Sequence, residues 1–347
     1  MPEATAMRPW TLELAGRLET RELTATALLD NPLGDPASRP VWVYLPPGYD
    51  ESRRRYPVVY LLQGFGGFVT HWGQRSMFSL TVPELIDAVF VSGAAPCLVV
   101  YVDAWTSLGG SQFLDSPGTG RYHTYLCEDV VGFVDGEYRT IPDAAHRGLL
   151  GHSSGGYGAI VAAMLRPDLF SAFASLAGDC CFELSLLPDV AAAYRALRDH
   201  YDGSYERFRA ELSSRPATPR AEDFTLNLVW AMSACYSAEP DGSVSLPFDT
   251  ATGRIRPDVW ARWLALDPVR MVEHHVPALR AARAIWVDAG RHDDHLLDVG
   301  AEILVAELAR VGVDDVAFEL FEGTHYHNAP RYPLAVSYLA PRLSQLR

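Results

Sequence analysis

The segment Gly151-His152-Ser153-Ser154-Gly155 is the clearest candidate for a chemical site in the sequence. It matches the pattern G-x-S-x-G and stands between an apolar segment, Arg147–Leu150, and a predicted helix, Gly155–Leu165. In such a strand–turn–helix the central serine takes a strained backbone conformation, so the residues two positions away must lack a bulky side chain. The hydroxyl is then exposed, and the N–H groups at the helix start face developing negative charge. The pattern predicts Ser153 as a nucleophile.

A serine hydroxyl needs a neighbouring histidine base, which in turn needs a carboxylate to orient it. Two later segments offer such partners, each directly after a predicted strand. Ala284–Val287 leads into Asp288–His295 (DAGRHDDH), and Val316–Phe321 leads into Glu322–His327 (EGTHYH). The order serine, acid, histidine is that of one known type of catalytic triad. We therefore expect the acid in the first segment and the base in the second.

Four motifs resemble those of the esterase D and enterochelin-esterase-like group of α/β-hydrolases. They are Tyr44–Tyr49 (YLPPGY), Tyr60–Gly67 (YLLQGFGG), Gly151–Ala159 (GHSSGGYGA) and Pro167–Phe170 (PDLF). This group includes S-formylglutathione hydrolases, feruloyl and acetylxylan esterases, and mycolyltransferases. The resemblance covers residues 38–180 and 284–340 and implies an enzyme that transfers acyl groups.

The resemblance also implies a role for particular residues. Its Gly-x-x-Asp step corresponds to Gly290–Asp293 and its Gly-x-His step to Gly323–His325. Ser153 would be the nucleophile, His325 the general base and then acid, and Asp293 the orienting carboxylate. Because loop boundaries are uncertain by a few residues, Asp294 or Asp288 stays open as the acid and His327 as the base.

An oxyanion hole needs two N–H donors. We expect the backbone N–H of Ser154, directly after the nucleophile, to be one of them. The second is expected in the loop after Val58–Leu62, and the resemblance assigns it to the backbone N–H of Phe65. Relatives often have His-Gly where this chain has Gln63-Gly64. This departure affects the hydrogen bonds behind the donor and leaves the donor itself in place.

The cluster His292-Asp293-Asp294-His295 and the nearby pair His274-His275 raise the question of a metal site. Neighbouring residues on an extended loop point in different directions, and the chain has no histidine pair at the i, i+4 spacing of a zinc-binding helix. The serine route already supplies a nucleophile. We expect no metal and no cofactor.

Short, continuously apolar segments bounded by Gly, Pro or Asp are typical of parallel strands covered on both faces. Alternating with helical patterns, they predict a doubly wound α/β sheet, the α/β-hydrolase fold, with antiparallel N-terminal edge strands within Gly16–Leu29. The predicted core strands are Val41–Leu45, Val58–Leu62, Leu98–Val102, Arg147–Leu150, Phe173–Leu176, Ala284–Val287 and Val316–Phe321. Predicted helices outside the central region are Gly155–Leu165, Val299–Val311 and Pro333–Leu346.

Residues 179–282 lack a convincing core strand and are rich in aromatic residues. Helical patterns at Leu187–His200, Tyr205–Leu212 and Pro257–Leu266 predict a helical cap inserted into a catalytic domain made of residues 1–178 and 283–347. We expect most of the aromatic side chains to pack the cap onto the body and a few to line a pocket.

The charge excludes several partners. The 347 residues contain 29 basic and 43 acidic side chains, for a net charge of −14, and every basic one is Arg. A nucleic acid requires a basic face, which the chain lacks, and an acidic membrane surface would repel it. The sequence predicts no nucleic-acid or membrane partner, and a homo-oligomer stays compatible with it.

The cysteines indicate the compartment. Five are present, with no CxxC or Cys/His metal spacing, so we expect reduced thiols in a cytoplasmic protein. They are Cys97, Cys127, Cys180, Cys181 and Cys235. We expect no signal peptide and no membrane span, because the N-terminus has no apolar segment after its charges and no stretch reaches 18 apolar residues.

The sequence thus predicts a serine esterase that cleaves a small-molecule carboxylic ester through an acyl-enzyme. The alternatives are an acyltransferase on the same triad, or a binding protein on a hydrolase fold.

Overall fold

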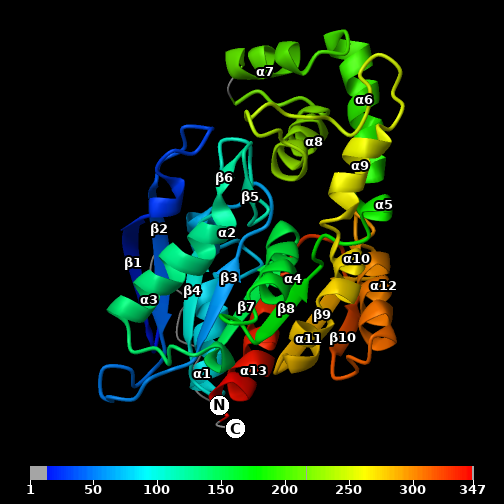
Figure 1. Ribbon diagram of the computed structural model, residues 1–347. Coiled ribbons are helices and arrows are strands. Elements are labelled where there is room, and N and C mark those ends of the chain that lie inside the picture. The colour runs from blue at the N-terminus through cyan, green and yellow to red at the C-terminus, as the bar shows by residue number, and fades with distance from the viewer. Residues whose placement is uncertain (1–13, 216, 346–347) are drawn as a thin grey trace.

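A computed structural model describes residues 14–215 and 217–345, and its core is an eight-stranded sheet with helices on both faces (Figure 1). The strand order is β1-β2-β4-β3-β7-β8-β9-β10. The strands are β1 (Arg17–Thr24), β2 (Ser38–Leu45), β3 (Val58–Leu62), β4 (Leu98–Val102), β7 (Arg147–His152), β8 (Ala172–Leu176), β9 (Ala284–Gly290) and β10 (Ala317–Phe321). A separate small ribbon pairs β5 (Asp115–Ser116) with β6 (Gly120–Arg121).

The β1–β2 and β2–β4 pairs are antiparallel, and every other pair in the large sheet is parallel. The predicted α/β class, with antiparallel strands at the N-terminal edge, is therefore confirmed. Only part of Gly16–Leu29 is extended, however. It forms β1 and then a 3₁₀ turn, Thr26–Leu28.

Alternate residues of the central strands enter two different cores, which explains their continuous apolarity. In β3, Val58, Tyr60 and Leu62 pack into one core, while Val59 and Leu61 pack into the other. All five are fully buried. Because successive strand residues point to opposite faces, a strand covered on both sides must be apolar throughout.

Helices α1 (Val82–Val91) and α13 (Arg331–Ser344) supply the core on one face of the sheet. On the other face lie α2 (Tyr122–Thr124), a π-helical turn (Tyr125–Val130), α3 (Val131–Glu137), α4 (Ser154–Leu165) and α12 (Leu297–Arg310). None of the helices in the described ranges is long and apolar enough to span a bilayer.

The chain between β8 and β9 is helical. Its helices are α5 (Phe182–Ser185), α6 (Leu187–Tyr201), α7 (Tyr205–Ser214), α8 (Asp223–Tyr236), α9 (Pro257–Leu264), α10 (Pro268–Met271) and α11 (Val276–Ala281). Helices α6 to α9 stand together beyond one end of the sheet (Figure 1), whereas α10 and α11 pack beside α4. Aromatic pairs hold the projecting helices together, among them Tyr205–Trp230 and Tyr236–Trp263.

Candidate active site

Ser153 lies at the sharp turn between β7 and α4, with φ 56° and ψ −125°, a conformation that non-glycine residues rarely adopt. The glycines on either side allow this turn. A Cβ on Gly151 would lie 2.1 Å from the carbonyl oxygen of Gly155, and a Cβ on Gly155 would lie 2.1 Å from that of Leu62. No side chain fits at either position, which is the physical reason for the G-x-S-x-G spacing.

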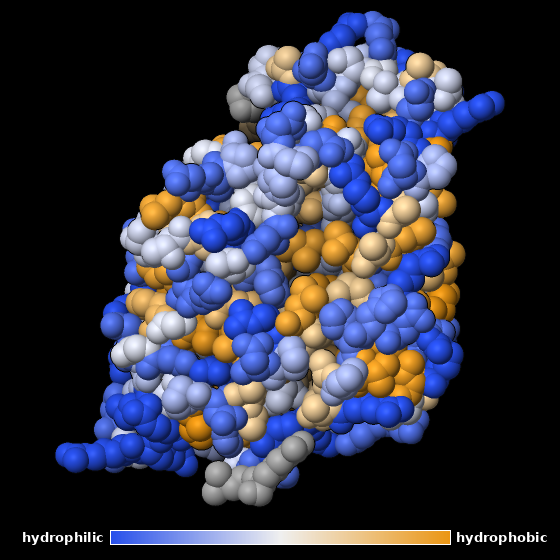
Figure 2. All heavy atoms as spheres, viewed as in Figure 1, coloured by the Kyte–Doolittle hydropathy of each residue, from blue (hydrophilic) through white to orange (hydrophobic). Residues whose placement is uncertain are grey.

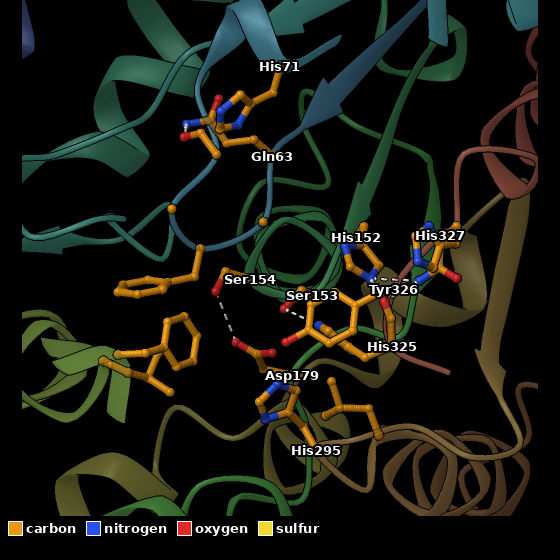
Figure 3. A pocket seen from close by; sticks show the side chains of 18 of the residues that line it. Gln63, His71, His152, Ser153, Ser154, Asp179, His295, His325, Tyr326 and His327 are labelled. Atoms are coloured by element: carbon orange, nitrogen blue, oxygen red, sulfur yellow. Dashed lines mark hydrogen bonds between the residues drawn. The ribbon is translucent and has the colours of Figure 1, made fainter. Parts of the chain in front are cut away.

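His325 connects Ser153 to Asp293. Its Nε2 lies 3.1 Å from Ser153 Oγ, and its Nδ1 lies 2.8 Å from Asp293 Oδ2. With the proton assigned to Nδ1, the ring donates to the carboxylate and accepts the serine hydroxyl. Figure 3 shows the His325 ring directed at Ser153.

Asp293 is held by the start of the next helix. Its Oδ1 accepts the backbone N–H groups of His295, at 2.8 Å, and Leu297, at 3.3 Å, and its side chain is fully buried. Burial alone would raise the pKa of Asp293, but the hydrogen bond and charge of His325 outweigh it and lower the pKa. The carboxylate is therefore ionised and able to stabilise an imidazolium.

The other candidate residues form no side-chain hydrogen bond to Ser153 or to the His325 ring. Asp294 Oδ2 accepts the backbone N–H of His325, at 3.3 Å, and does not hydrogen-bond to the ring. Asp288 is buried, accepts Trp286 Nε1 and Arg331 Nε, and has a pKa raised to about 6 by its burial despite the Arg331 charge. His327 lines the pocket in a left-handed conformation and hydrogen-bonds to no described residue.

The backbone N–H groups of Ser154 and Phe65 have no acceptor among the residues that the structure describes, as open oxyanion donors require. Their loops are in contact, because a Cβ on Gly64 would lie 3.4 Å from Ser153 Cβ. Gln63 donates from Nε2 to the carbonyl oxygen of Gly67. This hydrogen bond joins the two ends of the loop that carries the Phe65 N–H group.

Sequence reasoning missed Asn328. Its Nδ2 lies 2.6 Å from the carbonyl oxygen of His325 and 2.8 Å from Nε2 of His152. His152, expected to be structural, itself lies 2.9 Å from the same carbonyl. Together the two side chains fix the backbone that carries His325. No local pattern in the sequence signals a pairing over 176 positions.

These residues open into a pocket of about 610 Å³ (Figure 3). Its walls are the Gly64–Phe68 loop, the Tyr326–Ala329 loop, and side chains that precede or belong to α6 and α8, including Leu186, Asp189, Phe224, Leu228 and Met232. Apolar residues gather on the surface between the projecting helices and the body (Figure 2). Sequence reasoning also missed Asp179, which lies in this pocket beside Ser154.

The acidic side chains of the sequence cluster His292–His295 have separate partners, and the cluster does not converge on one point. Asp293 bonds to His325, while Asp294 bonds to the backbone of the same residue. Within residues 14–215 and 217–345, no group of three or more His, Cys, Asp or Glu side chains is arranged to hold a metal ion.

A family model described as "Putative esterase" matches residues 36–330. An endo-1,4-beta-xylanase/feruloyl esterase of Xylanibacter ruminicola is 26% identical over 140 residues, which are 39% of this chain and 19% of that protein. The chain thus spans about a fifth of the length of this relative.

Solved structures resemble the whole chain. A ferulic acid esterase superposes with a TM-score of 0.59 at 20% identity, over 96% of this chain and 99% of its own. An S-formylglutathione hydrolase from Agrobacterium tumefaciens gives 0.57 at 14% identity, over 96% and 98%. At these identities the likeness shows the fold, and the expected α/β-hydrolase fold is confirmed.

Proposed function

The chain belongs to the esterase family that its residues 36–330 match, and on that premise we propose that it hydrolyses small-molecule carboxylic esters through an acyl-enzyme on Ser153. The observation that carries the proposal is the continuous contact from Ser153 Oγ through the His325 ring to Asp293. A serine alone would not react, and this contact supplies both its base and the group that orients the base.

In the first step Ser153 Oγ attacks the ester carbonyl carbon while His325 Nε2 takes its proton. The carbonyl oxygen becomes an oxyanion, which the N–H groups of Ser154 and Phe65 stabilise. His325 then gives its proton to the leaving alcohol as the C–O bond breaks. A water molecule, deprotonated by the same Nε2, attacks the acyl-enzyme, and the acid leaves as Ser153 regains its proton.

We also propose that residues 179–282 act as a cap that shapes the substrate site. The support is the origin of the pocket wall, because Leu186, Asp189, Phe224, Leu228 and Met232 all come from this segment. Ser153, Asp293 and His325 come from outside it. The cap would then select substrates, while the sheet positions the reacting groups.

Replacement of the nucleophile tests this function. Ser153→Ala should lower kcat for a 4-nitrophenyl short-chain ester by about 10⁴-fold or more, because the covalent route is lost. A fluorophosphonate probe should label the wild-type chain at Ser153 and leave the variant unlabelled. Near-normal turnover by a variant with an unchanged thermal unfolding curve would refute the assignment.

A second measurement separates hydrolysis from acyl transfer on the same three residues. The acyl-enzyme is formed with a 4-nitrophenyl ester in the presence of added alcohols, and free acid and new ester are quantified. A hydrolase releases mostly the acid. A product that is almost entirely new ester would identify an acyltransferase.

A further inference from the structure

Two carboxylates, Asp179 and Asp189, line the pocket that contains Ser153. Asp179 follows β8 and is 7% exposed, and Asp189 lies in the first turn of α6. Among the described residues that line the pocket there is no Arg, and the chain has no Lys. The only basic side chains there are histidines.

One of the two carboxylate oxygens of Asp179 already accepts hydrogen bonds. Its Oδ2 accepts Ser154 Oγ, at 3.2 Å, and Gln112 Nε2, at 3.1 Å. Its Oδ1 accepts no hydrogen bond from any residue in the described ranges, and Figure 3 shows the second oxygen turned away from Ser154. A role limited to holding Ser154 and Gln112 explains Oδ2 and leaves Oδ1 without a function.

The Asp189 side chain forms no hydrogen bond and no ion pair with the described part of the chain, although the residue is partly buried. Its electrostatic neighbours are His295 and Asp179. Burial raises the pKa of both carboxyl groups. At Asp179 the hydrogen bond from Gln112 and the charges of His325 and His295 partly lower the pKa again. At Asp189 the charge of His295 does the same. Neither carboxyl group forms an ion pair with an Arg in the described part of the chain.

Burial of a carboxylate is costly unless a cation compensates it, and a neutral hydrogen-bond donor compensates it less than an ammonium does. The pocket also presents aromatic side chains, Phe224 and Tyr326, that are 52% and 55% exposed. Aromatic faces attract ammonium groups as well. An anionic substrate, in contrast, would meet two carboxylates and no Arg.

Building on the proposed ester hydrolysis, we propose that the substrates carry an ammonium group and that Asp179 Oδ1 and the Asp189 carboxylate bind it in the Ser153 pocket. The ammonium can belong to the acyl part or to the alcohol part of the ester. Asp179 and Asp189 would then be the residues that determine specificity.

Matched ester pairs test both sources. In the alcohol arm, acetylcholine is compared with 3,3-dimethylbutyl acetate, which replaces the nitrogen by carbon. In the acyl arm, 4-nitrophenyl 4-(dimethylamino)butanoate is compared with 4-nitrophenyl 5-methylhexanoate. At pH 7 the wild-type chain should show a kcat/KM about tenfold or more higher for the ammonium member of one pair, as expected for a cation held beside a partly buried carboxylate.

Charge-removing variants locate the effect. Asp179→Asn keeps an oxygen for Ser154, and it should lower the ratio of kcat/KM for the ammonium ester to kcat/KM for the neutral ester by about tenfold or more. Asp189→Asn should act in the same direction. Asp258→Asn removes an equal charge from an exposed position on α9 that does not line the pocket, and it should preserve the preference.

Equal rates for both members of each pair in the wild type would overturn the proposal. So would an Asp179→Asn variant that slows both members equally, since Asp179 would then only support Ser154. If neutral esters react in a Ser153-dependent way without an ammonium preference, this inference fails and the esterase proposal stands.

Binding separates the two proposals if no ester reacts at all. Calorimetry on the Ser153→Ala variant compares choline with 3,3-dimethylbutan-1-ol. Tighter binding of choline that Asp179→Asn removes supports the ammonium site independently of turnover. Equal binding, or none of either, refutes an ammonium site for the alcohol part, and the same comparison of 4-(dimethylamino)butanamide with 5-methylhexanamide tests the acyl part. Equal binding, or none, in both comparisons refutes the proposal.

Discussion

The imidazole ring of His152 packs against that of His325, with 4.6 Å between their centroids, and its Nε2 lies 2.9 Å from the His325 carbonyl oxygen. The residue directly before the candidate nucleophile thus supports the residue that carries the candidate base. Burial, and then the neighbouring His325 charge, lower the pKa of His152 to about 3. His152 is therefore neutral wherever the chain is folded near neutral pH.

This pKa predicts how stability depends on pH. An unfolded histidine has a pKa of about 6.5, so between pH 4 and 6 the unfolded chain binds one more proton at His152 than the folded chain. Acid therefore favours unfolding, by about 1.4 kcal/mol per pH unit from this residue. The measurement is urea unfolding of the wild type and His152→Gln at pH 4, 5 and 6. The wild type should lose stability faster than the variant as pH falls, and parallel curves would contradict the shifted pKa.

A second prediction distinguishes the adjacent residues Asp293 and Asp294. Asp293→Asn should lower kcat by about 10⁴-fold, since the asparagine no longer holds the productive tautomer of His325. Asp294→Asn removes only an acceptor for a backbone N–H, and its effect should stay within about tenfold. The measurement is steady-state hydrolysis of one ester by both variants. A larger loss in Asp294→Asn would move the acid by one position.

The two histidines of the last loop can be separated in the same way. His325→Ala should abolish acylation, because Ser153 Oγ then has no base within hydrogen-bonding distance. His327→Ala leaves the Ser153 contact intact and should retain acylation. Burst kinetics with a 4-nitrophenyl ester report this step directly. A variant at His327 that fails to acylate although it is folded would reverse the assignment.

Two glycines should respond to alanine in opposite directions. Gly155→Ala would place a Cβ 2.1 Å from the Leu62 carbonyl oxygen, and since a backbone carbonyl of a central strand cannot move aside, the loss of stability should exceed about 4 kcal/mol. Gly132 lies in α3 with open space around its Cβ position, so Gly132→Ala should stabilise the chain by about 0.5–1 kcal/mol. Denaturant unfolding, and soluble yield for the first variant, measure both effects.

Much of the sheet could be predicted because its signal is local. Val58–Leu62 and Leu98–Val102 are fully buried on both faces, and their observed bounds equal the predicted ones. The predicted helix Gly155–Leu165 begins one residue earlier, at Ser154. Helices α1 and α8 were not predicted. The first begins with a Thr81–Glu84 capping box that a search for helix starts would have found, whereas α8 is apolar on most sides and lacks a clear helical period.

The sequence predicts which loops carry the candidate acid and base, but it does not decide between neighbouring residues within each loop. Sequence order places an acid after β9 and a histidine after β10, but the choice between Asp293 and Asp294 depends on backbone angles that no spacing encodes. Asp179 and Asn328 could not have been found, because their partners are remote. Gln112 is 67 positions from Asp179, and His152 is 176 from Asn328.

Helices α6 and α8, which contribute side chains to the pocket, both lie in the segment between β8 and β9. The candidate catalytic residues lie outside this segment. Ser153 follows β7, Asp293 follows β9, His325 follows β10 and the Phe65 loop follows β3. With the cap role proposed above, new substrate ranges would arise by divergence, or by grafting, of a single continuous stretch of sequence. The reactive machinery would be inherited unchanged, which makes this scaffold well suited to directed evolution confined to α6–α9.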